Sequence, residues 1–430
     1  MFPVNHSPVD RHPRAGYLYL GVMMTALIVG LVGVSALSVA RVKFDTAQRQ
    51  NDLFSAQTLA RTAIEDAVRQ INDDASWRTN LSINVEYPDP AHNLGAGSFT
   101  WKLSDDDGNL SDDDADAAWL TGIGRVGDAV FVETVMLQPT GTGLSCLEAA
   151  LHCGSSVTLG SAADIETDQF FSSNGSINAS ALLSKIDGNA EAVGTITGAV
   201  TGTTTEGITP RRMPSETVFD YYLRNGTWID YDSLENGGGG KRIRQTVLSP
   251  NLNPFGSAVN AEGIYVIDCQ NQQLTIENTR ILGTLVLVNS SASTFIDFSQ
   301  YWSPAVLNYP TLLVDGSISF RYLSGDLDEN DQGSNYNPVG APYEGSEDSD
   351  TNDTYPSKIK GLVYVSGTLK LPSLAADSLV DGCVICGILD ARSDATFDYR
   401  ATFLNYPPPG FASGNPMQIA PGTWHRTTGP

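Results

Sequence analysis

"AGYLYLGVMMTALIVGLVGVSALSVAR", residues 15–41, contains no charged side chain before Arg41, and the charge that precedes it is Arg14. A helix of about 20 apolar residues is long enough to cross a lipid bilayer. The apolar core of a secretory signal is shorter, at about 7 to 15 residues. We therefore predict a membrane-spanning helix, and cleavage after Ala40 to release a secreted protein stays an open alternative.

The polar sequence that follows this run keeps a helical period. No proline interrupts residues 14–87, and small or branched apolar residues recur every three or four positions, as on one face of a helix. Arg61, Glu65 and Arg69 follow at i, i+4 spacing on a solvated face. The apolar positions are Ala56, Ala60, Ala63, Ile64, Ala67 and Ile71. We predict one helix from about Tyr17 to Asn72, roughly 85 Å long, with a membrane half and a half that packs on a folded domain.

The first residues, "MFPVNHSPVDRHPRAG", form a short basic segment that ends at Gly16, before the aromatic Tyr17. Together with the small and Ala-rich residues of "GVSALSVARVKFDTAQRQNDLFSAQTLARTAIEDAVRQIND", this start resembles the type IV minor pilins and the pseudopilins of type II secretion. Major pilins carry Glu at the fifth mature position, and here that position is Gly21. Some minor, tip-located subunits of the family lack this Glu as well.

The resemblance implies that a prepilin peptidase cuts between Gly16 and Tyr17. It also implies that the mature helix packs with other pilin-like subunits, in a type IV pilus or a secretion pseudopilus. The protein would then be single-pass in the inner membrane, with its bulk in the periplasm or at the cell surface. A plain signal anchor fused to an unrelated domain is the alternative that the residues leave open.

Composition limits the partners of the rest of the chain. The formal net charge is −24 over 430 residues, which argues against a nucleic-acid partner, because phosphate binding needs clustered Lys and Arg. Residues 76–153 are predicted to form a small α+β module, with Phe99, Trp101 and Leu103 on one face of a strand. The acidic turn after this strand is either a solvated turn or a calcium ligand set, from Asp105, Asp106, Asp107, Asp112, Asp113 and Asp114.

Short apolar runs recur after residue 154. They begin at 263, 283, 310, 361 and 382, and the long third interval shortens to about 20 residues if an acidic insertion at 325–355 is removed. A repeat of about 20 residues with short strands is typical of a parallel β-helix, whereas a β-sandwich turns every 8 to 12 residues or so. The predicted fold is mainly β: leader 1–16, transmembrane and amphipathic α-helix 17–75, small α+β module 76–153, and right-handed parallel β-helix body 154–430.

Several segments of this body, among them "EGIYVIDC", "ILGTLVLVN" and "IKGLVYVSG", resemble large bacterial envelope proteins, common in planctomycetes. Those proteins pair a pilin-like helix with a β-helix, and the resemblance implies no enzymatic activity. It does imply that the helix and the β-helix belong together. The β-helix would then present a surface for adhesion, for cargo or for surface polysaccharide.

Five cysteines are present, and their placement argues against a disulfide framework. Cys383 and Cys386 are three residues apart, so a strand points them to opposite faces. Cys146 and Cys153 flank "LEAALH", which we predict to be a short helix that separates them by about 10.5 Å, too far for a disulfide. We expect buried structural thiols.

Two acidic loops in the insertion are the candidate metal sites. "GDLDENDQG" and "EDSDTNDTY" both contain D-x-D-x-N-D, and alternate oxygens on a tight loop can converge on a calcium ion. Neither loop has the Gly or the final Glu of an EF-hand. A calcium site in one or both loops and a disordered acidic insertion both stay open, and we expect no other cofactor. The candidate ligands are Asp326, Asp328, Asn330, Asp331, Asp348, Asp350, Asn352 and Asp353.

The sequence thus favours a structural, non-enzymatic envelope protein. The alternative is a membrane-anchored or secreted protein that binds or cleaves polysaccharide, as a lyase or a hydrolase. Such cleavage needs carboxylates and a cationic group on one exposed face, which the sequence alone cannot establish. The candidates are Asp268, Asp297, Asp390 and Asp394 with Arg280, Arg321 and Arg392.

Overall fold

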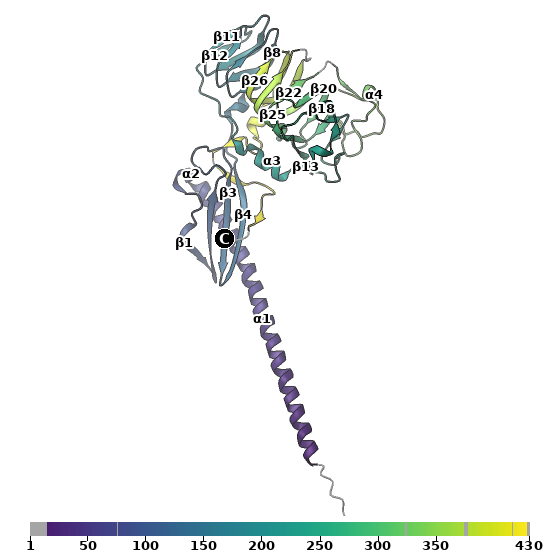
Figure 1. Cartoon of the computed structure of the whole chain (residues 1–430). Coiled ribbons are helices and arrows are strands. Elements are labelled where there is room, and N and C mark those ends of the chain that lie inside the picture. Colours follow the sequence, from purple (N-terminus) through teal and green to yellow (C-terminus); the bar gives the residue numbers. More distant parts are fainter. Residues whose placement is uncertain (1–14, 75, 323–324, 374–376, 415, 428–430) are drawn as a thin grey trace, which may run out of the picture.

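The computed structural model describes residues 15–74, 76–322, 325–373, 377–414 and 416–427, without the side chains of residues 15–17. One long helix projects from a small sheet module, and a larger β body lies at the far end of that module (Figure 1). Most of the predicted leader, residues 1–14, lies outside the described residues. The molecule is mainly β with a long N-terminal helix, as the sequence predicts.

Helix α1 (Ala15–Asp73) has 59 residues and confirms the single long helix expected from the sequence. All residues from 18 to 51 are exposed. From Ala56 onward one face becomes buried, and every apolar position predicted for that face has no exposed surface. Arg61, Glu65 and Arg69 are exposed on the other side, also as predicted. The 3.6-residue period therefore locates the packed half of the helix correctly.

The packed half lies on an antiparallel sheet in the order β1-β2-β3-β4. Phe99, Trp101 and Leu103 of β2 are buried in a core shared with α1. The chain returns here at its C-terminal end, where β29 and β30 both pair with β4. The strands are β1 (Tyr87–Leu94), β2 (Gly97–Ser104), β3 (Ala118–Val126), β4 (Ala129–Pro139), β29 (Met417–Ile419) and β30 (His425–Arg426).

Two glycines of β3 let α1 approach the sheet closely. A Cβ on Gly122 would lie 2.2 Å from the carbonyl oxygen of Ala60. A Cβ on Gly124 would lie 2.0 Å from the carbonyl oxygen of Ala56. Alanines on the helix and glycines on the strand thus bring the two backbones into contact, a common reason for glycine inside a strand.

The larger body is a stack of parallel strands. The apolar runs expected from the sequence are its strands, and they pair in register at the predicted intervals. The register includes Ile264 with Thr284, Leu285 with Leu312, Leu312 with Val363, and Val363 with Val384. In stack order the first row is β13 (Thr227–Ile229), β17 (Ile264–Asp268), β19 (Thr284–Ser290), β21 (Pro310–Gly316), β25 (Lys358–Leu371), β26 (Ser378–Ala391), β6 (Leu151–Cys153), β8 (Asp164–Ser173), β10 (Lys185–Ala192) and β12 (Thr204–Glu206).

A second and a third row of parallel strands lie beside the first. The second contains β15 (Lys241–Arg244) and β16 (Val247–Leu248), then β18 (Leu274–Leu282), β20 (Phe295–Ser303), β22 (Ile318–Arg321) and β27 (Ala395–Tyr399). The third contains β7 (Val157–Thr158), β9 (Ile177–Ala179) and β11 (Ile196–Gly198). A large apolar core is buried among the rows. Short helices are α2 (Trp77–Asn80), α3 (Asp220–Asn225), α5 (Thr402–Asn405), η2 (Glu216–Phe219) and η3 (Tyr231–Ser233).

The stack does not follow chain order. The chain enters at β6, in the middle, and runs outward through β8, β10 and β12. It then crosses to the other end at β13 and returns until β26 pairs with β6. Antiparallel pairs occur as well, β14 (Glu235–Asn236) with β15 and β5 (Thr142–Gly143) with β28 (Ala412–Ser413). The structure therefore shows stacked parallel strands, but not the single right-handed parallel β-helix predicted for 154–430.

The predicted helix "LEAALH" is wrong. A 3-10 helix, η1, occupies Ser145–Glu148, and the strand β6 begins at Leu151. Leu147 belongs to one core cluster, whereas Ala150 and Leu151 belong to the other, so tertiary packing overrides the local helix propensity. Cys383 and Cys386 do point to opposite faces, because they belong to different core clusters. All five cysteines are buried and free.

The acidic insertion 325–355 is a folded lobe and not a disordered segment. It contains β23 (Leu327–Asp328), α4 (Glu329–Gln332) and β24 (Thr354–Tyr355), and β23 pairs antiparallel with β24. Buried aromatic and aliphatic side chains of the lobe pack on the stack, so it has a small core of its own. The sequence signal for this core was three tyrosines among the carboxylates, at 336, 343 and 355.

Candidate functional site

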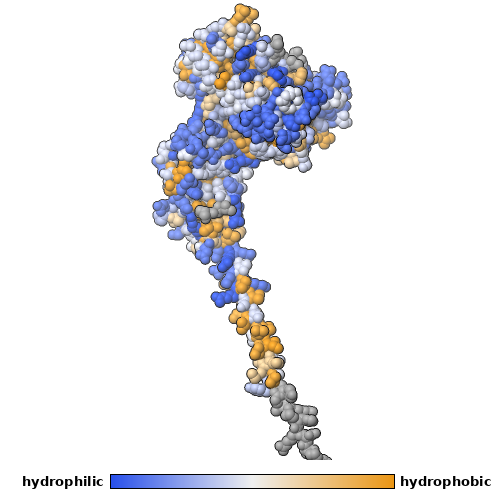
Figure 2. All heavy atoms as spheres, viewed as in Figure 1, coloured by the Kyte–Doolittle hydropathy of each residue, from blue (hydrophilic) through white to orange (hydrophobic). Residues whose placement is uncertain are grey.

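The projecting half of α1 is an exposed apolar surface. Figure 2 shows hydrophobic residues along the projecting part and hydrophilic residues where the helix meets the sheet module. Leu27, Val29 and Leu31 are each more than half exposed. Among the described residues, α1 is the one helix long and apolar enough to cross a bilayer. Transfer of such a surface from water into lipid, or against other apolar helices, is strongly favourable.

Ion pairing and hydrogen bonds hold the other half of α1 to the sheet. Arg61 pairs with Glu133 of β4 through two hydrogen bonds, of 3.0 and 3.2 Å. Glu133 is buried at 6% exposure. Near the end of the helix, the side chain of Asn72 exchanges two hydrogen bonds with the backbone of Met417 in β29. The helix is therefore fixed at both ends of its packed half.

The predicted processing residues lie at the start of this helix. Gly16 and Tyr17 are within the backbone of α1, and the side chain of Tyr17 is outside the described part of the chain. Gly21, at the position where major pilins have Glu, has no atom within 4 Å of a Cβ built on it. Cleavage between Gly16 and Tyr17 stays a prediction.

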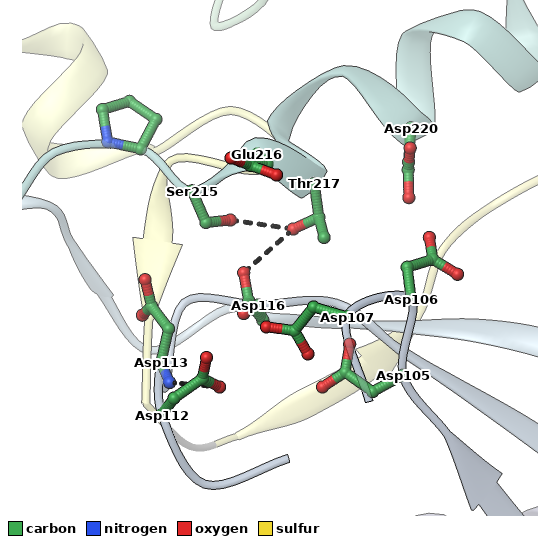
Figure 3. A pocket seen from close by; sticks show the side chains of 11 residues that line it. Asp105, Asp106, Asp107, Asp112, Asp113, Asp116, Ser215, Glu216, Thr217 and Asp220 are labelled. Atoms are coloured by element: carbon green, nitrogen blue, oxygen red, sulfur yellow. Dashed lines mark hydrogen bonds between the residues drawn. The ribbon is translucent and has the colours of Figure 1, made fainter. Parts of the chain in front are cut away.

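A second candidate site is an acidic pocket between the sheet module and the β body (Figure 3). It has a volume of about 650 Å³ and lies between the β2–β3 connection and the segment that leads into α3. Residues far apart in sequence thus contribute carboxylates to one cavity. Its lining residues are Asp105, Asp106, Asp107, Asp112, Asp113, Asp116, Pro214, Ser215, Glu216, Thr217 and Asp220.

Burial and mutual repulsion raise pKa values in this pocket. Burial, and then the charge of Asp107, raise the pKa of Asp105 to about 6. Burial, and then the charge of Asp106, raise the pKa of Asp220 to about 6. Burial is also the main cause of the raised pKa of Asp116. Asp105 and Asp220 therefore gain protons at mildly acidic pH, where ordinary surface aspartates stay ionised.

Part of the negative charge is balanced by arginine. Arg212 forms ion pairs with Asp113 and Asp114. Arg78 lies close by, but it donates to two backbone carbonyls, those of Leu110 and Asp116. Asp105 keeps one buried carboxylate oxygen without a hydrogen-bond partner.

Three carboxylates of the pocket have the geometry of a cation ligand set. The ligand atoms of Asp107, Asp112 and Asp116 all lie within 4.8 Å of one another. Carboxylate oxygens are the ligands that calcium prefers. The sequence analysis named the first two but missed Asp116, which is buried beyond the acidic run. It also missed Glu216 and Asp220, because only the tertiary fold brings them to the pocket.

The two predicted calcium loops lie side by side in the folded lobe, where their carboxylates bind protein donors. Asp328 caps α4 by accepting a hydrogen bond from the Asp331 amide, at 3.1 Å. The side-chain amide of Asn337 donates to Asp348 at 3.1 Å and to Asp353 at 2.9 Å. Calcium at these loops stays a prediction. The remaining candidates, Asp326, Asn330, Asp331, Asp350 and Asn352, are exposed.

The lobe is tied to the stack by Arg280 of β18, which is 3% exposed. Its guanidinium donates to the carbonyl oxygens of Tyr336 and Ala341, each at 2.6 Å, and to that of Pro342. Arg280 was a candidate catalytic cation in the sequence analysis. In the structure it is a buried structural side chain.

The other candidates for polysaccharide cleavage have separate partners. Asp297 forms an ion pair with Arg321, at 2.6 Å, and Asp390 pairs with Arg392, at 2.9 Å. Asp268 accepts hydrogen bonds from Gln270 and Asn289, and Asp394 accepts one from the Asp164 amide. The described contacts therefore place these groups in different environments and do not bring them together at one cleft.

Comparisons with known proteins give little further information. No protein family profile matches the chain, and no curated protein is similar to it in sequence. Among solved structures, the competence-associated pilin ComZ from Thermus thermophilus is similar over 87% of this chain and 98% of its own, with 10% identity and a TM-score of 0.30. Similarity at this level supports no inference about fold or function.

Proposed function

We propose that this chain is a pilin-like structural protein of the bacterial cell envelope, a minor pilin or pseudopilin. A prepilin peptidase removes residues 1–16, and the helix from Tyr17 then anchors the protein in the inner membrane. The same apolar helix packs with other pilin-like subunits during assembly. The β body outside the cytoplasm presents a surface for adhesion or cargo, with surface polysaccharide as one class of contact.

The observation that carries this proposal is the division of α1 into two halves. Residues 18–40 span about 35 Å as a helix, which covers the hydrocarbon core of a bilayer, about 30 Å thick. Residues 41–51 continue the helix as an exposed polar spacer. A plain anchor needs no rigid continuation into the folded domain, whereas a subunit that packs through its helix does. The backbone-to-backbone contact of α1 with Gly122 and Gly124 supplies that rigidity.

The first part of the proposal, membrane anchoring and assembly, rests on the helix. The second part, presentation of a surface, rests on the β body. The stacked parallel strands support a rigid, elongated surface, because each strand is buried only by its neighbours. We propose that the stack acts as a β-helical body, with calcium in the acidic lobe as its cofactor. Two of the candidate carboxylates, Asp297 and Asp390, are paired with arginines, and Arg280 is buried, which favours a binding surface over a hydrolytic centre.

The test is the N-terminal residue of the protein purified from its native envelope, measured by mass spectrometry. We expect the chain to begin at Tyr17, with a methylated amino group. A Gly16→Leu variant should keep Met1, because the leaders of the family that this start resembles end in Gly at the cleaved bond. A Gly21→Ala variant is the matched control and should still begin at Tyr17.

Two other results would contradict the proposal. A wild-type chain that begins at Met1 would be a signal anchor without pilin processing. A chain that begins at Arg41 would be a secreted β protein, and polysaccharide binding or cleavage would then become the leading hypothesis.

A further inference from the structure

Two buried sulfur atoms meet where the stack closes. In chain order, β6 is the first strand of the stack and β26 is one of the last, and they pair in parallel with Cys153 opposite Cys386. The two residues are separated by 233 positions along the chain. Both side chains have no exposed surface and belong to the main apolar core. This pair therefore lies at the seam between the first and the last part of the β body.

The geometry of the pair is close to that of a disulfide. The two Sγ atoms lie 3.5 Å apart, in contact. Adjacent strands are about 4.7–4.9 Å apart, so residues in register fall within the Cα separation of natural disulfides, about 4.4–6.8 Å. A small rotation of each side chain would bring the sulfurs to bonding distance. Cys383 differs, because it faces the opposite core and donates a hydrogen bond to the carbonyl oxygen of Ala149, at 3.1 Å.

We propose that Cys153 and Cys386 form a disulfide that closes the seam of the β body. This inference rests on the envelope location of the proposed function, since that compartment oxidises thiols. The oxidant is a disulfide of a low-molecular-weight thiol or of a dithiol oxidoreductase.

The exchange occurs in two balanced steps. The thiolate of one cysteine attacks the donor disulfide, forms a mixed disulfide and releases one donor thiolate. The thiolate of the second cysteine then attacks the protein sulfur and releases the second donor thiolate. The two cysteine sulfurs are oxidised, the donor sulfurs are reduced, and the two protons pass to the donor thiolates.

The bond forms during folding, before the seam closes. In the folded protein both thiols are fully buried, and burial raises the pKa of Cys153 well above its ordinary value, so little thiolate is available for exchange. Once formed, the bond holds together two strands that are distant in the chain, and it restricts the unfolded state. Reduction should therefore require unfolding.

The experiment uses the full chain in detergent, unfolded and refolded with a mixture of reduced and oxidised glutathione. After alkylation of free thiols and proteolysis, we expect a linked peptide that contains Cys153 and Cys386, and three alkylated cysteines instead of five. The melting temperature of the oxidised protein should fall by several degrees when it is refolded with a reductant. Cys153→Ala and Cys386→Ala variants should lose this redox dependence, and Cys269→Ala, another buried cysteine, should keep it.

Peptide mapping of the wild-type protein remains decisive if a variant fails to fold. Five alkylated cysteines after oxidative refolding would overturn the proposal, wherever the protein is located. A linked peptide after refolding but five free thiols in protein from the native envelope would also overturn it, because the compartment would then not supply the bond. Neither result depends on the N-terminal residue, so failure of the pilin-like function would be seen separately.

Discussion

The two halves of α1 share one continuous backbone and have opposite surroundings. Residues 18–51 are exposed in the isolated chain, and most of their apolar side chains are large. The half from Ala56 to Ile71 is buried by the sheet, and its apolar side chains are mostly alanine. One half therefore offers hydrophobic surface to an environment outside the chain, and the other uses small residues to fit its own sheet.

This difference shows that apolar content alone does not tell a membrane segment from a packed segment. The packed half is recognised by its period and by small residues that permit close approach. The projecting half is apolar on all sides, as a segment surrounded by lipid or by other helices must be. The same type of substitution should therefore have different effects in the two halves of α1.

The largest effect is expected where α1 and β3 touch. Gly124→Val places a Cβ about 2.0 Å from the carbonyl oxygen of Ala56, so the helix must move away from the sheet. Valine suits a strand otherwise, so the loss reports the collision and should exceed about 3 kcal/mol of unfolding free energy. Denaturant unfolding in detergent, followed by the fluorescence of buried Trp101, measures it.

Gly33→Val is the matched control in the projecting half. A Cβ on Gly33 meets no atom within 4 Å, so the stability of the folded module should not change. If both valines destabilise the module equally, the halves are not independent and the comparison fails.

A charged substitution should act in the opposite way: it should impair the projecting half and not an exposed position of the packed half. Val29→Arg puts a cation near the centre of the apolar half, at a cost of about 3 kcal/mol for membrane insertion. The folded module should be unaffected. Thr58→Arg introduces the same charge on an exposed position of the packed half and should leave insertion unchanged. Extraction from membranes at alkaline pH distinguishes the two variants, and equal extraction would argue against insertion of residues 18–40.

Sequence patterns are most informative where the structure is regular and local. The spacing of Ala56, Ala60 and Ala63 fixes the packed face of α1, and the apolar runs fix the strands of the stack together with their register. Each of these signals needs only a few neighbouring residues. The helix boundaries, at Ala15 and Asp73, are within two residues of those predicted.

Long-range order could not be predicted in the same way. Nothing local to Leu151 indicates that β6 will lie between β8 and β26, and this insertion breaks the simple β-helix. The acidic pocket depends in the same way on Asp220, which is more than a hundred residues from Asp105. Only the return of the chain along α3 brings these carboxylates together. The close approach of α1 to the sheet did have a local signal that could have been used, the glycines of β3.

A smaller effect is expected when the carboxylate charge that holds the packed half of α1 to the sheet is removed. Glu133→Gln keeps the shape of the side chain but removes the charge that Arg61 meets at 3.0 Å. Because Glu133 is buried, the loss should be about 1 to 2 kcal/mol of unfolding free energy. Asp73→Asn, which removes the exposed partner of Arg69, should have much less effect. Equal losses would mean that burial of Glu133 adds nothing to the contact.

The smallest effect is a pH dependence confined to the module that carries the packed half. Burial raises the pKa of Asp105 to about 6 in the folded state, above about 3.9 for the unfolded chain. The folded state therefore binds this proton more tightly, and the stability that it contributes is complete below pH 4 and lost as pH rises through 6. Asp105→Asn should raise the unfolding free energy at pH 8 by about 1 kcal/mol, after allowance for solvent screening, and should change it little at pH 4.

The projecting half carries no charge between residues 15 and 40, so membrane extraction of both the wild-type protein and the Asp105→Asn variant should be the same at the two pH values. A variant that gains the same stability at pH 4 as at pH 8 would show that the carboxyl is not the titrating group.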